Sequence, residues 1–367
     1  MAGVVTVVVV TAALGAAAAA EYNVVGYGAR PDGRTDSARA FLAAWAAACN
    51  DTGGGSSTAP VVRVPAGTFL CSAPAAVDST AWIQFHYAHG LKIRGGTLDG
   101  RGEAFWACKA AGRQCPPGST TLDISQSNNV SVRRLTLLNS KTAHLSVFDC
   151  AGVTLRGLRI VAPAGSPNTD GVHVQFSCGV RILGATVRTG DDCVSLGPGT
   201  SDVLVRNIRC GPGHGISIGS LGGEPGEVGV RNVTVDGAAL AGTQNGLRIK
   251  TWGRPNRGHV AGVSFARVTM RGVRNPIVVD QNYSPGNLNC PGKSSAVKIS
   301  GVEYTDVEGT SATPVAVRFD CSGSYPCTGI MLKNVNLTYQ GEPAQTFCRN
   351  AHGSASGVVS PPSCLSS

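Results

Sequence analysis

Three aspartates, one histidine and two basic residues occur in a short stretch of the chain at spacings suited to acid–base chemistry. Four strand-like segments carry most of them: DGVHV (170–174), DCVSL (192–196), HGISI (214–218) and GLRIK (246–250). Asp170 and Asp192 are 22 residues apart, and so are Asp192 and His214. Each precedes the first apolar residue of its segment by two positions, which predicts that they stack on one face, one coil apart. Asp191 lies directly beside Asp192.

The two basic residues, Arg248 and Lys250, alternate with Leu247 and Ile249. We therefore expect them to point away from the core, as the acids do. Closely placed carboxyls can cleave a glycosidic bond, because one protonates the leaving oxygen while another activates water. Mutual repulsion raises the pKa of at least one of them, which supplies a proton donor. Since Arg binds a carboxylate bidentately and Lys adds a point charge, the pattern predicts action on an anionic sugar.

Each motif also has a purely structural interpretation. Asp-Gly is common in turns, an Asp pair can be solvated, and Arg-x-Lys can be a solvated strand face. Stacking like charges is costly, however, so the joint pattern favours function. Calcium is the alternative occupant of an acidic cluster. His214, Arg248 and Lys250 crowd the site with positive charge, and we expect no metal and no cofactor.

A recurring pattern, apolar-x-apolar-x-x-apolar-x-apolar, indicates the elements that position these groups. Its copies start at residues 130, 153, 180, 203, 228, 263, 297 and 330, with a degenerate first copy at 91–98. Start-to-start spacings of 23 to 35 residues indicate stacked units, each too small to bury its own apolar face. The alternation is strand-like and leaves no room for long helices. We predict an all-β fold, a right-handed parallel β-helix built as a single-stranded solenoid.

The ends of such a solenoid need covering, because they expose unpaired strand edges. A helical run beginning at Asp36-Ser37, with Phe41, Trp45 and Ala48 on one face, is the candidate N-terminal cap. We expect a single domain over residues 21–367, without a linker. Residues 1–20 are apolar, carry no charged side chain and end in Ala18-Ala19-Ala20, which indicates a secretory signal peptide. An uncleaved membrane anchor is the alternative.

Secretion makes disulfides the expected use of the 13 Cys, and because this number is odd, at least one is free or pairs with another chain. Sequence proximity suggests four bonds: Cys108–Cys115, Cys193–Cys210, Cys321–Cys327 and Cys348–Cys364. Cys49–Cys71 is a weaker suggestion, and Cys150, Cys178 and Cys290 have no assigned partner. Because no Cys-x-x-Cys pair occurs, zinc is disfavoured. Glycosylation sequons occur at Asn50, Asn129, Asn232, Asn282 and Asn336.

Composition supports a compact basic protein. Of 367 residues, 42% are hydrophobic and 14% charged, which excludes an intrinsically disordered chain. The net charge of +9 suits a secreted, extracellular or cell-wall protein that acts on an anionic polysaccharide. We expect a monomer with no nucleic-acid partner and, after signal cleavage, no membrane partner.

Four ordered motifs resemble those of plant polygalacturonases, the pectinases of glycoside hydrolase family 28. They are Asn168-Thr169-Asp170, Gly190-Asp191-Asp192, Gly213-His214-Gly215 and Arg248-Ile249-Lys250. The stretches GHGISIGSLG (213–222) and YNVVGYGARPDGRTD (22–36) are also similar to plant members. The resemblance covers most of residues 21–364. It implies hydrolysis of α-1,4-linked galacturonan with inversion and without a metal.

The resemblance also implies roles for individual residues. Asp191 would be the general acid, Asp170 and Asp192 would activate water, and His214 would tune the acid. Arg248 and Lys250 would bind substrate carboxylates, Asn168 would support Asp170, and Tyr283 would serve the substrate site. The chain departs from the family at Tyr283-Ser284, where plant members usually have Tyr-Cys; this change creates the Asn282 sequon and suggests Cys290 as the displaced cysteine.

Two other functions stay open at this point. One is a catalytically silent pectin-binding wall protein, and the other is a pectate lyase, which shares the β-helix. The motifs leave endo or exo action undecided, and the overall resemblance leans toward exo action.

Overall fold

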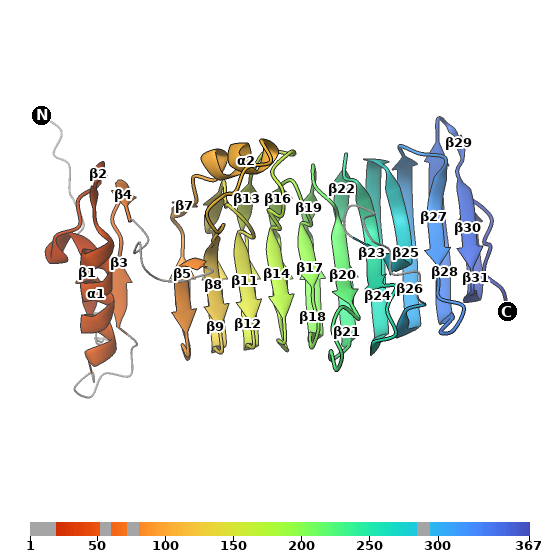
Figure 1. Ribbon diagram of the computed structural model, residues 1–367, viewed down its shortest axis with the longest axis horizontal. Coiled ribbons are helices and arrows are strands. Elements are labelled where there is room, and N and C mark those ends of the chain that lie inside the picture. Colours follow the sequence, from red (N-terminus) through yellow and green to blue (C-terminus); the bar gives the residue numbers. More distant parts are fainter. Residues whose placement is uncertain (1–19, 52–59, 72–80, 285–293) are drawn as a thin grey trace, which may run out of the picture. The chain divides into compact units, whose positions relative to one another are not determined.

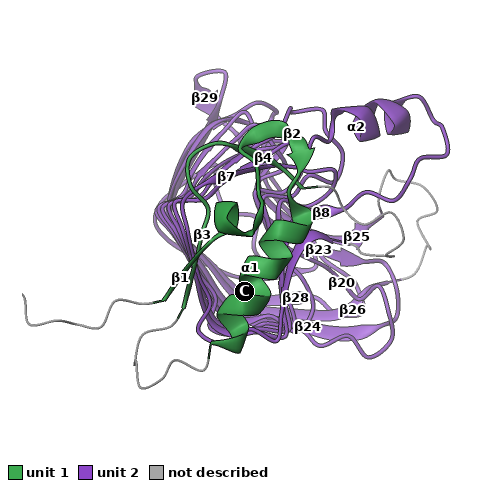
Figure 2. Ribbon diagram, turned by 90° about the vertical axis from the view of Figure 1, so that its left-hand side faces the viewer, with its two compact units in different colours: residues 1–78 green, residues 79–367 purple. Residues whose placement is uncertain are grey.

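The computed structural model describes residues 20–51, 60–71, 81–284 and 294–367, which form two compact units, residues 1–78 and 79–367 (Figure 2). Apart from Ala20, the predicted signal peptide lies outside the described residues, and so does Cys290. No helix within the described ranges combines the length and the apolar character needed to cross a bilayer.

The first unit packs one helix against short strands. Its elements are β1 (Glu21–Asn23), η1 (Val24–Tyr27), β2 (Asp32–Asp36), α1 (Ala38–Asn50), β3 (Val61–Arg63) and β4 (Thr68–Leu70). β1 pairs with β3 and β2 with β4, both in parallel. The helix begins where predicted, but Ala40 and Ala44 form its buried face together with Val24 and Ala29. Of the predicted face, Ala48 is buried and Phe41 packs against this cluster, but Trp45 is 37% exposed, so the buried face is turned away from Trp45.

The second unit is a parallel β-helix, as predicted, in which successive coils stack along one axis (Figure 1). One wall is a ten-stranded sheet: β5 (Ala81–His86), β8 (Thr120–Ser125), β11 (Leu145–Phe148), β14 (Val172–Gln175), β17 (Val194–Leu196), β20 (Ile216–Leu221), β23 (Asn245–Trp252), β25 (Asn275–Tyr283), β27 (Val315–Asp320) and β30 (Gln345–Arg349). A short helix, α2 (Glu103–Ala110), interrupts the chain between the first coils.

The repeat copies form the other wall, a seventeen-stranded sheet. Its strands are β6 (Lys92–Arg94), β7 (Thr97–Asp99), β9 (Asn128–Arg133), β10 (Thr136–Leu138), β12 (Ala151–Arg156), β13 (Arg159–Val161), β15 (Arg181–Leu183), β16 (Thr186–Arg188), β18 (Ser201–Arg206), β19 (Arg209–Cys210), β21 (Val230–Asp236), β22 (Ala239–Ala241), β24 (Arg257–Val273), β26 (Ala296–Ser311), β28 (Cys327–Tyr339), β29 (Glu342–Pro343) and β31 (Ala351–Ser360). In most coils the two-residue break of the pattern bends one strand into two.

The repeat pattern misplaces two of its copies. Asn207, in the copy that starts at Val203, has a left-handed φ of 54°, and Asn232 has the same φ but lies at a different bend of the coil. Val203 therefore pairs with Val233, not with Val228. The copies at 228–235 and 297–304 both begin five residues too early for the same reason. Each coil has two bends with the same apolar pattern on either side. Only the register of the paired strands shows which bend a given copy of the pattern belongs to.

Stacked aliphatic side chains fill the interior between the two walls. In the ten-stranded sheet, Leu145, Val172, Val194, Ile216 and Leu247 are consecutive register partners, and each has 0% exposure. Full burial of one such side chain contributes about 1.5 to 3 kcal/mol. This ladder fixes the register, because a slip of one residue would turn every apolar side chain outward.

All four predicted disulfides are present: Cys108–Cys115, Cys193–Cys210, Cys321–Cys327 and Cys348–Cys364. The weaker suggestion is wrong, because Cys49 is a free, exposed thiol and does not pair with Cys71. Cys49 follows the buried position Ala48 by one residue, which turns its side chain about 100° away from the buried face of α1.

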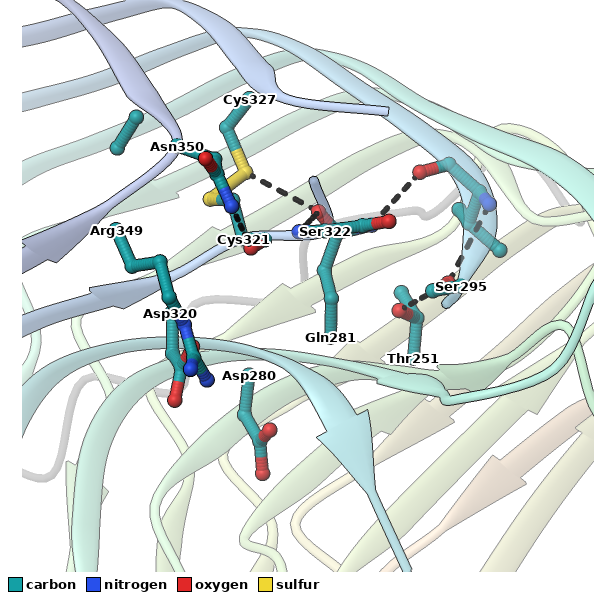
Figure 3. Close-up of a disulfide and its surroundings, with 12 residues drawn as sticks. Thr251, Asp280, Gln281, Ser295, Asp320, Cys321, Ser322, Cys327, Arg349 and Asn350 are labelled. Carbon is teal, nitrogen blue, oxygen red and sulfur yellow. Dashed lines mark hydrogen bonds and ion pairs between the residues drawn. A yellow bond between two sulfur atoms is a disulfide. The ribbon is translucent and has the colours of Figure 1, made fainter. Parts of the chain in front are cut away.

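Around the Cys321–Cys327 bond, side-chain amides satisfy buried backbone groups (Figure 3). Gln281 is fully buried; its Nε2 donates to the carbonyl of Val297 at 2.8 Å, and its Oε1 accepts from the amide of Ser322 at 3.0 Å. These bonds tie the end of β25 to β26 and to the segment that follows β27. They stabilise the strand that carries Tyr283.

The predicted glycosylation sites are all at the surface. The side chains of Asn50, Asn129, Asn232, Asn282 and Asn336 are exposed, as glycan attachment requires. Their occupancy stays a prediction.

Removal of the Cys193–Cys210 bond should destabilise the second unit. Both sulfurs are buried, and Cys193 directly follows Asp192. The double change Cys193→Ala and Cys210→Ala should lower the free energy of unfolding by about 3 kcal/mol, measured by urea titration. The pair Cys108→Ala and Cys115→Ala, at the end of α2, should cost less because its bond spans 7 residues instead of 17 and because its loss opens no cavity in the core. Equal losses would mean that burial adds nothing to the effect of the bond.

Candidate active site

The four strands predicted to carry the site are consecutive in the ten-stranded sheet. β14, β17, β20 and β23 pair in parallel, with Val172, Val194, Ile216 and Leu247 in register. The residues just before the strands follow the same stacking. The amide of Gly171 donates to the carbonyl of Asp192 at 2.8 Å, and the amide of His214 donates to that of Asp191 at 2.8 Å. The predicted phase is therefore confirmed.

Asp192 is the most deeply buried of the three carboxylates and has the most partners. It is 1% exposed; its Oδ1 accepts from Ser217 Oγ at 2.7 Å and from Arg248 Nη2 at 2.9 Å, and its Oδ2 accepts from Lys250 Nζ at 2.8 Å. The side chains of Arg248 and Lys250 are only 12% and 10% exposed. Two cations around one carboxylate leave one positive charge uncompensated here, which suits an additional anionic group.

Asp191 pairs with His214 on the more open side of the cluster. His214 Nδ1 lies 2.9 Å from Asp191 Oδ1, and the two side chains are 33% and 18% exposed. The amide of Asp192 also donates to that oxygen, at 2.8 Å. Burial raises the pKa of Asp191, but the hydrogen bond and charge of His214 outweigh it, and the net pKa lies below the ordinary value. Asp191 therefore holds a proton less tightly than an ordinary aspartate does.

The pKa of Asp170 is shifted in the opposite direction to that of Asp191. Burial and then the charges of Asp192 and Asp191 raise its pKa to about 7. Its Oδ2 lies 2.6 Å from Ser195 Oγ. The carboxyl cluster therefore keeps a proton up to near-neutral pH, and Asp170 is where this proton is held most tightly.

Two histidines beside Asp170 were not singled out from the sequence. His144 is fully buried, its Nδ1 lies 3.1 Å from the Asp170 carbonyl oxygen, and burial lowers its pKa to about 4. His173 lies on β14, with Nδ1 2.8 Å from Ser195 Oγ, and burial lowers its pKa. His173 stands at an outward-facing position of DGVHV, and this alternation is the signal that could have found it.

The other predicted substrate residues lie at the edges of the cluster. The Tyr283 ring lies 5.3 Å from Lys250 Nζ and packs edge-on against Trp252 at 5.7 Å, so Trp252 joins the site. Asn168 is exposed, with a left-handed φ of 55°. Among the described residues, no hydrogen bond joins Asn168 to Asp170. The aromatic pair borders the cations, and the support from Asn168 stays a prediction.

Comparison with known proteins decides the family. The model of "Glycosyl hydrolases family 28" matches residues 62–361. The chain belongs to glycoside hydrolase family 28. It is 49% identical to a polygalacturonase of Prunus persica, over 94% of this chain and 93% of the relative. It is 36% identical to an exopolygalacturonase of Platanus acerifolia, over 93% of this chain and 96% of the relative.

A solved structure supports the fold of this family 28 chain. The endo-xylogalacturonan hydrolase from Aspergillus tubingensis superposes with a TM-score of 0.79 at 24% sequence identity, covering 92% of this chain and all of that one. The resemblance inferred from the four motifs is thus confirmed, and so is the prediction of a glycoside hydrolase with a parallel β-helix.

A metal ion is poorly suited to the carboxylate cluster of this glycoside hydrolase. Donor atoms of Asp191, Asp192 and His214 do lie within 4.8 Å of one another. Both oxygens of Asp192, however, already accept from Arg248 or Lys250. A divalent ion would have to displace these cations or share the carboxylate with them, which electrostatic repulsion disfavours.

Proposed function

We propose that this protein is a secreted polygalacturonase that hydrolyses α-1,4-galacturonosidic bonds of pectin with inversion at the anomeric carbon. The observation that carries this proposal is the set of three carboxyls on adjacent coils, in three different environments, beside a partly compensated pair of cations. Hydrolysis with inversion needs one protonated and one ionised carboxyl, and this arrangement supplies both. The names of the plant relatives support the same substrate.

The roles are those that the family motifs imply. Asp191, on the open side and paired with His214, receives the proton that the cluster holds at Asp170 and donates it to the leaving oxygen. Asp170 and Asp192 activate the attacking water, and their cluster holds one proton that the reaction redistributes. Arg248 and Lys250 orient the carboxylate of the sugar and stabilise Asp192. Asn168 and Tyr283 border the same subsites.

The test is release of reducing ends from polygalacturonate, with the anomer of the first product read by proton NMR. Release of the inverted anomer is expected. Binding without any product would favour a silent pectin-binding protein. An unsaturated product that absorbs in the ultraviolet and disappears on chelation would favour a lyase.

We also propose exo action and location in the cell wall. The lengths of the products formed in the first minutes distinguish exo from endo cleavage. Monomer from the start is expected for exo action, whereas a mixture of oligomers would mean endo action.

The pH dependence should report the proton of the carboxyl cluster. Because the pKa of Asp170 is raised to about 7, the cluster keeps this proton below that pH and loses it above. kcat/KM should therefore fall about tenfold per pH unit on the alkaline side of neutrality, since the required proton is gone. A profile that rises through pH 7 would contradict this assignment and make loss of the Asp170 proton a requirement for activity.

A further inference from the structure

A chain of hydrogen-bonding groups leads from the Asp170 carboxyl to the His173 imidazole. With Asp170 written as a carboxylate, Ser195 Oγ donates to its Oδ2 at 2.6 Å, and the same hydroxyl lies 2.8 Å from His173 Nδ1. His173 and Ser195 are register partners on β14 and β17, and Ser195 is 2% exposed. A hydroxyl carries a single proton, so Ser195 can donate to Asp170 or to His173, but not to both.

This restriction couples the states of the two end groups. When Asp170 is ionised, Ser195 donates to it and His173 must donate from Nδ1. When Asp170 carries a proton, its O–H donates to Ser195, and Ser195 donates to an unprotonated Nδ1. Passage between these arrangements moves the Asp170 proton to Ser195 and the Ser195 proton to His173. Protons balance without any further reactant.

Gln175 selects between the two arrangements. Its Oε1 lies 3.3 Å from His173 Nε2. An amide oxygen only accepts, so Nε2 carries the hydrogen and a neutral imidazole leaves Nδ1 free to accept. Burial acts in the same direction, because it lowers the pKa of His173 and raises that of Asp170.

We propose that His173 is a positioning residue that, through Ser195, holds a proton on Asp170. The hydrogen-bond coupling stands on the geometry alone, whereas its use in catalysis rests on the proposed hydrolase function. The sequence motif of the family places Asp170 in the site, and the structure adds two groups whose hydrogen bonds are coupled to the ionisation of this carboxyl.

Other charges also face these groups and must stay constant in a test. Asp191 and Asp192, just before β17, raise the pKa of Asp170, whereas a hydrogen bond donated by Ser195 and the charge of Lys250 on β23 lower it. Asp192 and Lys250 also act on His173. On the other side, the β11 partner of His173 is Ser146, which is uncharged, and beyond it on β8 is Asp123. Changes at His173, Ser195 or Gln175 leave all these charges in place.

The pH midpoint of Asp170 in the folded chain can be read without catalysis, as the pH at which the gain in stability from Asp170→Asn, measured against urea, stops rising. In the His173→Phe background, Ser195 is free to donate to ionised Asp170, and this pH midpoint should fall by about one unit. Gln175→Met, which removes only the anchor of the imidazole, should lower it in the same direction. His259→Phe, at an exposed position of β24, should leave it unchanged.

Ser195→Ala distinguishes coupling from a general loosening of the site. In that background, adding His173→Phe should move the midpoint no further, because the coupling runs through the hydroxyl. Equal shifts with and without Ser195, or no shift in His173→Phe and Gln175→Met, would overturn the proposal. If wild type releases no sugar while the titration shifts as expected, the proposed function fails and the coupling stands.

Discussion

Asp191→Asn is expected to lower kcat on polygalacturonate by about 10² to 10⁴-fold, the usual contribution of a general acid. The amide cannot donate a proton to the leaving oxygen, yet it keeps the size of the carboxyl and one of its two hydrogen bonds. Asp191 Oδ1 accepts from the amide of Asp192 and pairs with His214, and an amide oxygen can keep the first of these bonds. KM should change little, because the substrate is held by the cations Arg248 and Lys250 and not by Asp191.

The control for this prediction is Asp149→Asn, an equivalent change at an exposed position after β11. It should leave kcat unchanged. Initial rates of reducing-end release, measured on both purified variants over a range of substrate concentrations, separate kcat from KM. A rate for Asp191→Asn within a few-fold of wild type would remove Asp191 from the acid role.

Asp170→Asn is expected to stabilise the folded protein while it abolishes activity. In the unfolded chain the carboxyl ionises near pH 3.8, whereas in the folded chain its pKa is about 7. Between these values the unfolded state binds fewer protons, so wild-type stability falls as pH rises. The neutral amide avoids this loss, and the gain should reach about 3 to 4 kcal/mol at pH 8 and largely vanish at pH 4.

Asp192→Asn is the matched control and should change the stability in the opposite direction, by destabilising the folded protein. Asp192 compensates Arg248 and Lys250 in a buried position, and its amide would leave both cations without a counter-charge. Breaking such a pair costs about 3 kcal/mol or more. Urea midpoints of the two variants, compared with wild type at pH 4, 6 and 8, provide the test. Destabilisation by Asp170→Asn at pH 8 would mean that this carboxyl is not held protonated.

The arrangement agrees with a common trade-off between stability and activity. A buried carboxyl next to two others is costly for the fold, and a neutral side chain at that position relieves the strain. The Asp192 ion pairs offset part of this cost within the same cluster. A site that keeps a proton near neutral pH therefore depends on a fold stiff enough to hold three carboxyls together, and the aliphatic ladder supplies this stiffness.

Sequence spacing was a reliable guide in the ten-stranded sheet and a weaker one in the opposite wall. Asp170, Asp192 and His214 share a phase with a strictly alternating apolar pattern, so their stacking followed from period alone. The repeat copies at 228–235 and 297–304 were misplaced because both bends of a coil have the same apolar signature. On α1, the packing of Ala40 and Ala44 rotated the buried face away from Trp45 and left Cys49 exposed.

The sequence by itself determined the class of fold, the four disulfides and the residue types of the site, because these depend on period, spacing and composition along one chain. Only the tertiary structure decided how charge is distributed among the acids. Which carboxyl keeps a proton depends on distances between coils: Arg248 and Lys250 reach back to Asp192, His214 to Asp191, and His173 through Ser195 to Asp170. Electrostatic energies vary steeply with such distances and with burial, and neither quantity is encoded in residue spacing.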